Sequence, residues 1–330
     1  MDYTAFNGKR IMITGANGLI GRALVFALVK NSTAKIVALV RNEQKAKTVF
    51  ADLPQDRIEY YVADVTTLEP KNANVDYVVH AANQTASKAF IERPVEVIES
   101  SIAGTRNVLE FAKVNAVKSF VYLSTMEVYG APPLPDKIYE TSPAYLDSTA
   151  VRSSYPESKR VCECLCSAYF AEYGVPAKTV RLTQTFGEGV EYSDKRVFAE
   201  FARCAIEGRN VVLKTKGETE RNYLYVGDAV TAILTVLLHG KNGEAYNAAN
   251  EETYCSIAGM AESVAANFGD GKIKVVIEDN GNAEKLGYAP VLKMNLATDK
   301  LRALGWQPEV GLTETFARLI DYMKKDRHDD

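Results

Sequence analysis

Short apolar runs rich in β-branched residues alternate with helical patterns through the first half of the chain. This alternation, without a long linker, is the order that a parallel sheet with crossover helices requires. The predicted strands are residues 10–14, 35–40, 58–62, 75–80, 119–124 and 177–182, and the predicted helices include 18–30, 95–114 and 155–173. The pattern therefore predicts an α/β fold of the Rossmann type, a doubly wound parallel sheet.

The regular alternation loosens after Arg181. Helices are still predicted at residues 198–207, 226–238 and 256–267, but glycine-containing turns and short strands separate them. We predict a dinucleotide-binding Rossmann domain over residues 1–183, with residues 220–250 returning to it. A smaller, discontinuous C-terminal substrate domain is predicted over residues 184–219 and 251–330.

Composition and charge limit the partners of the chain. Its 330 residues are 47% hydrophobic, which supports a large core, and its formal charge is −3. Lys and Arg are scattered, so no basic footprint for nucleic acid is present. No apolar run approaches the ~18 residues that span a bilayer, and Met1 is followed by no leader pattern. We expect a cytoplasmic protein with neither nucleic-acid nor membrane partners.

Five cysteines without a secretion signal favour a reducing compartment. Cys162, Cys164 and Cys166 suggest a metal site at first, but a spacing of two on a predicted helix directs neighbours to opposite faces. We therefore predict helix packing at these positions and no bound metal.

The turn after the first predicted strand carries Gly15, Gly18 and Gly21. Glycines at these positions permit a tight turn and let backbone N–H groups approach a pyrophosphate at the start of the following helix. A plain strand-to-helix turn is the alternative. We predict that NAD or NADP binds here, and the cofactor-binding residues in this turn would be Gly15, Asn17, Gly18, Leu19, Ile20 and Gly21.

Two further strand ends bear on the cofactor. Asp64 and Val65 follow the third strand, where the carboxylate would accept a hydrogen bond from the exocyclic amine of adenine, although a surface aspartate is equally consistent with the pattern. Arg41 ends the second strand, where NAD sites usually offer an acidic residue to the ribose. An arginine there would clamp a 2′-phosphate, which favours NADP slightly, or it would lie over the adenine.

Tyr155 and Lys159 lie four residues apart at the start of a helical pattern, so both project from one face. A cation beside a phenol favours phenolate, and positive charge from Lys159 and an oxidised nicotinamide would lower the tyrosine pKa from about 10 towards the working pH. Tyr155 would then act as a general base. An accidental surface pair is the alternative, but Ser124 and Thr125 precede the pair at a spacing that favours a catalytic group.

Several motifs together resemble the extended short-chain dehydrogenase/reductase family. They are the glycine turn at residues 14–21, the Tyr155 and Lys159 pair, and the segments 124–130, 221–228 and 298–306. More narrowly, they are similar to its NAD-dependent epimerase/dehydratase branch, which acts on nucleotide sugars. The resemblance runs nearly from end to end.

The resemblance implies three catalytic roles. Tyr155 would take the proton from the sugar 4-hydroxyl while hydride leaves C4 for the nicotinamide. Lys159 would hold the ribose and tune Tyr155, and Thr125 would hydrogen-bond the same sugar hydroxyl.

The resemblance also implies binding roles and an oligomeric state. Ala81 and Ala82 would line the cofactor, while Gln184 and Arg221 would contact the sugar nucleotide, with Arg221 suited to its diphosphate. In this family the helices at residues 95–114 and 155–173 often form a dimer interface, so a homodimer is expected.

Departures from the family pattern narrow the reaction. Ser101 stands where many relatives carry Asn, which removes any proton-relay role of that Asn. Met126 replaces the Asp of the 4,6-dehydratases, and the loss of that acid disfavours 4,6-dehydration.

Glu127 is retained as a fourth catalytic candidate. This residue and the segments 151–155 and 185–187 are similar to UDP-glucuronate decarboxylases, although the arginine expected after Gly187 is absent. Decarboxylation is the first expectation and 4-epimerisation its close competitor. A 4,6-dehydratase, an NADPH-consuming ketoreductase and a non-catalytic NADP-binding regulator are the remaining alternatives.

Overall fold

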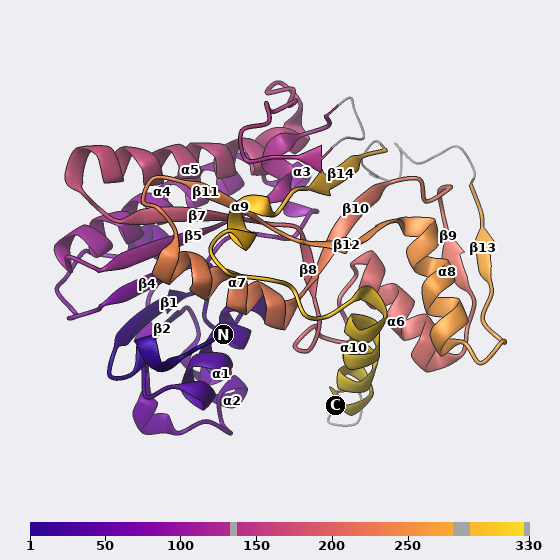
Figure 1. Ribbon diagram of the computed structural model, residues 1–330, viewed down its shortest axis with the longest axis horizontal. Helices are drawn as coiled ribbons and strands as arrows, with labels where there is room; N and C mark the ends of the chain where they lie inside the picture. The colour runs from indigo at the N-terminus through magenta and orange to yellow at the C-terminus, as the bar shows by residue number, and fades with distance from the viewer. Residues whose placement is uncertain (133–136, 280–290, 327–330) are drawn as a thin grey trace.

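A seven-stranded parallel sheet forms the centre of the computed structural model, which describes residues 1–132, 137–279 and 291–326 (Figure 1). The strand order is β11-β7-β5-β4-β1-β2-β3. The strands are β1 (Arg10–Thr14), β2 (Lys35–Val40), β3 (Ile58–Val62), β4 (Tyr77–His80), β5 (Ser119–Thr125), β7 (Ala177–Leu182) and β11 (Ala245–Ala248). This is the α/β Rossmann-type fold that the sequence predicts.

Helices cover both faces of this sheet. They are α1 (Leu19–Asn31), α2 (Glu43–Val49), α4 (Pro94–Val114), α5 (Ser154–Tyr173) and α7 (Val226–His239). Ile11 and Ile13 lie in one buried cluster with residues of α1 and α7, whereas Met12 lies in a second cluster with residues of α4 and α5. Because successive strand residues face opposite sides, burial of both faces explains the continuous apolar runs of the sequence.

Local sequence sets the ends of the two long helices. Pro94 occupies the first turn of α4, where its missing N–H needs no partner, and Gly174 ends α5 with a φ of +71°. Within α5, Cys162 and Cys166 are buried while Cys164 is exposed. The cysteines thus lie on different faces of the helix, as the two-residue spacing predicts.

A second, smaller sheet lies beside the first (Figure 1). Its order is β12-β10-β14-β6, with β8 paired to β10, and β9 and β13 form a separate pair. The strands are β6 (Lys137–Ile138), β8 (Gln184–Phe186), β9 (Val211–Leu213), β10 (Glu220–Tyr225), β12 (Asn250–Ser256), β13 (Val275–Ile277) and β14 (Lys293–Leu296). Residues of α6 (Val197–Glu207), α8 (Ile257–Phe268) and α10 (Leu312–Asp326) form its core with Phe186 and Tyr223.

Short elements complete the described chain. They are α3 (Ala89–Glu92), α9 (Asp299–Arg302) and the 3-10 turns η1 (Thr4–Phe6), η2 (Gln55–Arg57), η3 (Val65–Thr67), η4 (Met126–Tyr129) and η5 (Val151–Ser153). In the part of the chain that the structure describes, no helix combines the length and apolar character needed to cross a bilayer.

In the structure, four of the six predicted strands begin and end at the predicted residues, and β5 extends one residue further than predicted, to Thr125. The fourth strand begins at Tyr77 instead of residue 75, and the half-buried carboxylate of Asp76 before it accepts a hydrogen bond from the Arg10 backbone. The sequence predicts that residues 220–250 return to the Rossmann domain. In the structure, β11 and α7 of this segment pack with the large sheet, whereas β10 belongs to the small sheet. The division into two domains stays a prediction.

Candidate active site

A cavity of about 910 Å³ lies at the carboxyl ends of the parallel strands. Its wall includes residues that follow β1, β2, β3 and β4, the end of β5, and Tyr155 and Lys159 of α5. Open α/β sheets bind ligands at this edge. Every cofactor-binding residue predicted from the sequence lines the cavity, namely Gly15, Asn17, Gly18, Leu19, Ile20, Gly21, Arg41, Asp64, Val65, Ala81, Ala82, Tyr155 and Lys159.

The glycine turn requires two of its glycines. Gly15 has a φ of +63°, and a Cβ atom there would lie 2.9 Å from the Cα atom of Ala82. A Cβ atom on Gly21 would lie 2.2 Å from the carbonyl oxygen of Gly15. These contacts bring the turn against the segment after β4 and leave the start of α1 beside the cavity. Such a turn fits the diphosphate of a dinucleotide, which backbone N–H groups at a helix start can bind.

His80 connects the two segments behind the turn. Thr14 Oγ1 lies 2.7 Å from His80 Nδ1 and accepts a hydrogen bond of 3.0 Å from the Ala82 backbone, while His80 Nε2 lies 3.3 Å from Thr105 Oγ1. Burial, with a smaller effect of the nearby Lys159, lowers the pKa of His80 to about 3. A neutral imidazole therefore supports this edge of the site at physiological pH.

Arg41 and Asp64 face one another across the cofactor end of the cavity. The guanidinium of Arg41 is 4.0 Å from Asp64 Oδ2, and its side chain is 83% exposed. Asp64 Oδ1 already accepts hydrogen bonds from the backbone and hydroxyl of Thr66, and the backbone hydrogen bond is the main reason that the pKa of Asp64 is lowered. Oδ1 of Asp64 thus holds the first turn of η3 through Thr66, and Oδ2 of Asp64 lies beside Arg41.

Tyr155 is buried in the first turn of α5. Its ring stacks on Phe90 of α3, with centroids 4.2 Å apart and an interplanar angle of 8°. Burial raises the pKa of Tyr155, and the negative charge of Glu127 raises it further. A hydrogen bond with Thr125 and the charge of Arg152 act in the opposite direction. The protein alone therefore favours the neutral phenol.

Lys159 lies one helical turn after Tyr155. Its ammonium donates a 2.7 Å hydrogen bond to the carbonyl of Leu123 and is 5.9 Å from the centroid of the Tyr155 ring. Burial lowers the pKa of Lys159 to about 8. The lowered tyrosine pKa expected from the sequence combined two positive charges, and only Lys159 belongs to this chain. The influences that lower the Tyr155 pKa within this protein come from Thr125 and Arg152, and burial outweighs them.

Glu127 contacts both a catalytic candidate and a residue that sequence reasoning did not assign. Its backbone N–H donates a 3.3 Å hydrogen bond to Thr125 Oγ1, and its carboxylate lies 2.8 Å from the guanidinium of Arg152. Thr125 and Glu127 both line the cavity beside Tyr155. The fold thus brings together all four catalytic candidates, although they come from two separate segments.

The two predicted substrate residues of the second sheet have different surroundings. Gln184 of β8 lines the cavity. Arg221 of β10 is not among the lining residues in the described part of the chain, and its Nε atom is buried there without a hydrogen-bond partner. Its diphosphate-binding role stays a prediction.

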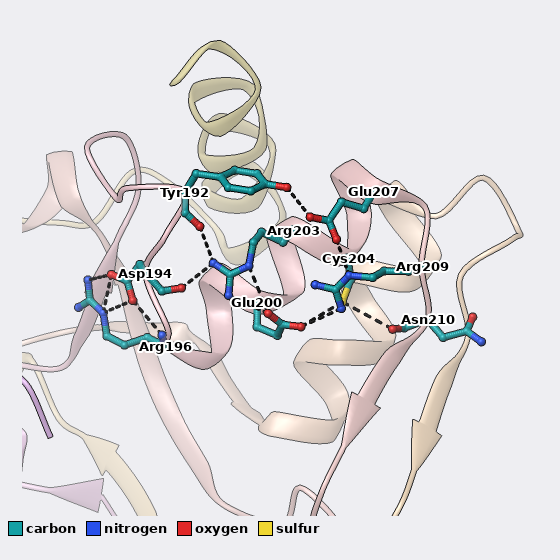
Figure 2. A network of polar contacts seen from close by, with 9 residues as sticks. All are labelled: Tyr192, Asp194, Arg196, Glu200, Arg203, Cys204, Glu207, Arg209 and Asn210. Carbon is teal, nitrogen blue, oxygen red and sulfur yellow. Dashed lines mark hydrogen bonds and ion pairs between the residues drawn. The ribbon is translucent and has the colours of Figure 1, made fainter. Parts of the chain in front are cut away.

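Arg196, which precedes α6, lines the cavity although sequence reasoning did not select it. Its guanidinium makes hydrogen bonds of 2.6 and 3.0 Å with Asp194 Oδ2 and lies 4.7 Å from the Phe198 ring centroid. Figure 2 shows how Arg203 secures this segment, because its guanidinium donates to the backbone carbonyls of Tyr192 and Asp194. The only sequence signal for this arrangement is a cluster of charges around α6, which is equally typical of an exposed helix.

Residues 11–249 of the chain match a family model whose description is "NAD dependent epimerase/dehydratase family". The chain belongs to this family. UDP-glucuronic acid decarboxylase 1 of Xenopus tropicalis is 28% identical over 322 residues, which cover 96% of this chain and 73% of that protein. The dTDP-D-glucose 4,6-dehydratase of Mus musculus is 25% identical, over 97% of this chain and 90% of the relative.

Solved structures agree with the fold of this epimerase/dehydratase family member. The dTDP-glucose 4,6-dehydratase of Bacillus anthracis, in complex with NAD, superimposes with a TM-score of 0.80 at 20% identity, covering 97% of this chain and 98% of that one. The resemblance to extended short-chain dehydrogenase/reductases of the nucleotide-sugar branch is thus confirmed, as is the assignment as an enzyme of this type. All of α8 and α10 lie beyond the matched residues.

Proposed function

We propose that this family member oxidises C4 of a nucleotide-activated sugar, and that UDP-glucuronate is its substrate for decarboxylation. The observation that carries the proposal is the convergence of Thr125, Glu127, Tyr155 and Lys159 on the cavity that the glycine turn also lines. When bound, NAD accepts a hydride from the sugar and can return it. The residues at the turn would hold its diphosphate, and Lys159 would hold its ribose.

The side chains then divide the remaining work. Tyr155, as phenolate, would remove the proton of the 4-hydroxyl, while Thr125 would hold that hydroxyl in place. The resulting β-keto acid loses carbon dioxide when the C5–C6 bond breaks and its electron pair enters an enolate at C4. Glu127, as the carboxylate paired with Arg152, would orient the sugar ring, and C5 would then take up a proton from water.

We propose NAD rather than NADP as the cofactor. The family description names NAD, and Asp64 faces Arg41 at 4.0 Å, so a 2′-phosphate that paired with Arg41 would also meet a carboxylate. The sequence alone favoured NADP slightly because of Arg41. Titration calorimetry with both dinucleotides tests the choice. Tighter binding of NADP, lost in Arg41→Ala, would reverse it.

The deciding experiment for the reaction uses UDP-glucuronate with carbon-14 in its carboxylate. Release of labelled carbon dioxide together with a UDP-pentose, without net consumption of dinucleotide, is the expected result. Steady consumption of added NADPH would indicate the ketoreductase. Dinucleotide binding without turnover of any sugar nucleotide would indicate a regulator.

A 4-epimerase is the second candidate, and the loop after β8 favours it. Glu188 stands where decarboxylases are expected to carry an arginine, and one of its carboxylate oxygens is buried without a hydrogen-bond partner in the described part of the chain. Without that arginine a substrate carboxylate would lack a cationic partner, whereas a neutral sugar needs none. Conversion of UDP-glucose to its C4 epimer, with no release of carbon dioxide from UDP-glucuronate, would establish this alternative.

We also propose that the enzyme is a homodimer formed through α4 and α5. Apolar side chains remain exposed on both helices, including Val95 and Val114 of α4 and Val161 and Phe170 of α5. Apolar side chains in such numbers on adjoining helices are typical of a protein interface. Light scattering at micromolar concentration should give twice the chain mass, and a monomer mass would refute the dimer.

A further inference from the structure

Arg152 connects three parts of the cavity wall although it does not line the cavity in the described part of the chain. It belongs to η5, directly before α5. Its guanidinium lies 2.8 Å from Glu127 Oε2 and 4.8 Å from the centroid of the Phe90 ring. Phe90 in turn stacks on Tyr155 at 4.2 Å. One cation therefore contacts the carboxylate and the aromatic ring that flank the proposed base.

The electrostatic effects of Glu127 and Arg152 on Tyr155 are opposed. After burial, Glu127 is the next largest influence that raises the pKa of Tyr155, and Arg152 lowers it. Two other titratable groups lie near the ring in the described structure: Lys159, 5.9 Å from its centroid, and Tyr122 of β5, whose ring is 4.7 Å from the same ammonium. Of these groups, Arg152 is the one paired with Glu127.

We propose that Arg152 is a positioning residue of the reaction centre, which fixes the Glu127 carboxylate at the cavity wall and offsets its charge in front of Tyr155. It acts on Tyr155 through its own charge and through its contacts with Glu127 and Phe90, and it does not line the cavity in the described part of the chain. The inference rests on the proposed role of Tyr155 as the general base. It assigns a role to a residue of the segment 151–155 that the sequence comparison with decarboxylases left without one.

The geometry favours this role over that of an ordinary surface ion pair. The Arg152 and Glu127 side chains are 37% and 34% exposed, and an isolated pair at that exposure contributes little to stability. Arg152 additionally covers the face of a fully buried phenylalanine, a contact that holds its guanidinium in one plane. Two independent contacts thus fix its position relative to Tyr155.

The test measures the ionisation of Tyr155 directly, without turnover. Protein labelled with carbon-13 at the tyrosine Cζ atoms is titrated by NMR as its NAD complex, and the Tyr155 signal is assigned from its absence in Tyr155→Phe. In Arg152→Gln the pKa of Tyr155 should rise by about one unit, the shift typical of losing one nearby opposite charge. Arg152→Lys should restore part of the difference.

A double-mutant cycle tests the route through Glu127. Glu127→Gln alone should lower the pKa of Tyr155, and the effect of Arg152→Gln should fall to about half or less in that background. Arg160→Gln is the matched control, because Arg160 lies two turns further along, on α5, and pairs with Glu157 instead. It should leave the Tyr155 pKa unchanged.

An unchanged Tyr155 pKa in Arg152→Gln, with the folded fraction intact, would overturn the proposal. Equal effects of Arg152→Gln with and without Glu127 would overturn the route through that carboxylate. If Arg152→Gln does not fold, the Tyr155 pKa in Glu127→Gln tests the inference instead. A Tyr155 pKa equal to that of the wild type in Glu127→Gln would contradict it. Failure of the proposed reaction would appear separately, as absent turnover with normal Tyr155 titration.

Discussion

The two sides of the cavity are built in different ways. The cofactor side follows from neighbouring parallel strands, where the turns after β1, β2, β3 and β4 meet at one edge and backbone packing at Gly15 and Gly21 sets the shape. The substrate side includes Gln184 from the small sheet and Arg196 from a loop that the ion pairs around α6 hold in place (Figure 2). Backbone packing tolerates little change, whereas a wall of paired side chains can be altered one contact at a time.

Tyr155 lies between the two sides, and its loss should have the largest effect. Tyr155→Phe removes the proposed base but keeps the stacking on Phe90, so kcat should fall about 1,000-fold, as expected for a general base. NAD and UDP affinities, measured by calorimetry, should stay within about twofold because the ring and its packing remain. Tyr173→Phe, at the exposed end of α5, is the control. Near-normal kcat in Tyr155→Phe would contradict the assignment.

Gly21→Ala tests the backbone packing of the cofactor side. The added methyl would lie 2.2 Å from the Gly15 carbonyl oxygen, so the turn must shift. We expect a loss on the order of 1–3 kcal/mol in the free energy of unfolding and at least about tenfold weaker NAD binding. Urea unfolding and calorimetry measure both. Gly311→Ala, with no atom within 4 Å of its added methyl, should change neither. Unaltered NAD affinity in Gly21→Ala would show that the turn accommodates a side chain.

His80 makes the stability of the cofactor side depend on pH. Its pKa is about 3 in the folded protein and 6.5 ordinarily, so below pH 6.5 the unfolded chain takes up a proton that the folded protein does not. The free energy of unfolding should therefore fall as the pH drops, by about 2 kcal/mol from this group between pH 7 and pH 5.

Urea unfolding of the wild type and His80→Asn at both pH values isolates this contribution. The variant should lose about 2 kcal/mol less than the wild type between the two pH values, whatever its absolute stability. His239→Asn, a change at an exposed position, should lose as much as the wild type. Equal pH dependence in His80→Asn and the wild type would be incompatible with a buried neutral imidazole.

Arg196→Ala should have the smallest effect and should separate the two sides. Arg196 lines the cavity and would make a charge-assisted contact with a nucleotide diphosphate, which its pairing with Asp194 would partly offset. We expect UDP binding to weaken about tenfold and NAD binding to change less than about twofold. Calorimetry with UDP and with NAD measures both. Equal weakening of the two ligands would assign Arg196 to the cofactor side instead.

The sequence predicted strand bounds best where the pattern of neighbouring residues defines the strand. The bounds of β1, β2 and β7 followed from apolar runs between turns, because these strands are buried on both faces. The bounds of β3, a partly exposed edge strand, followed from a short run of β-branched and aromatic residues. The strands outside the large sheet were harder to predict, since β8, β9 and β13 have only three residues each and pair with strands far away in the sequence. Strands this short leave no periodic pattern to detect.

The candidate site divides in the same way. The glycine turn and the Tyr155–Lys159 pair are local motifs, so their spacing and the family resemblance selected them as candidates, and their chemistry stays a prediction. Phe90, Arg152 and Arg196 gave no such signal, because their roles depend on contacts between separate segments. Arg221, in contrast, belongs to a recognisable motif but lies outside the set of residues that line the cavity in the described structure.

The amino-acid sequence by itself determined the parallel α/β architecture and selected the glycine turn and Tyr155 as candidates, since each depends on patterns among residues a few positions apart. Only the tertiary structure decided what surrounds Tyr155. It placed Arg152 against Glu127, 25 residues away, and stacked Phe90 on Tyr155. The physical reason is that burial and charge at Tyr155 are set by loops from different strands, and the paths of those loops are fixed by packing across the whole fold.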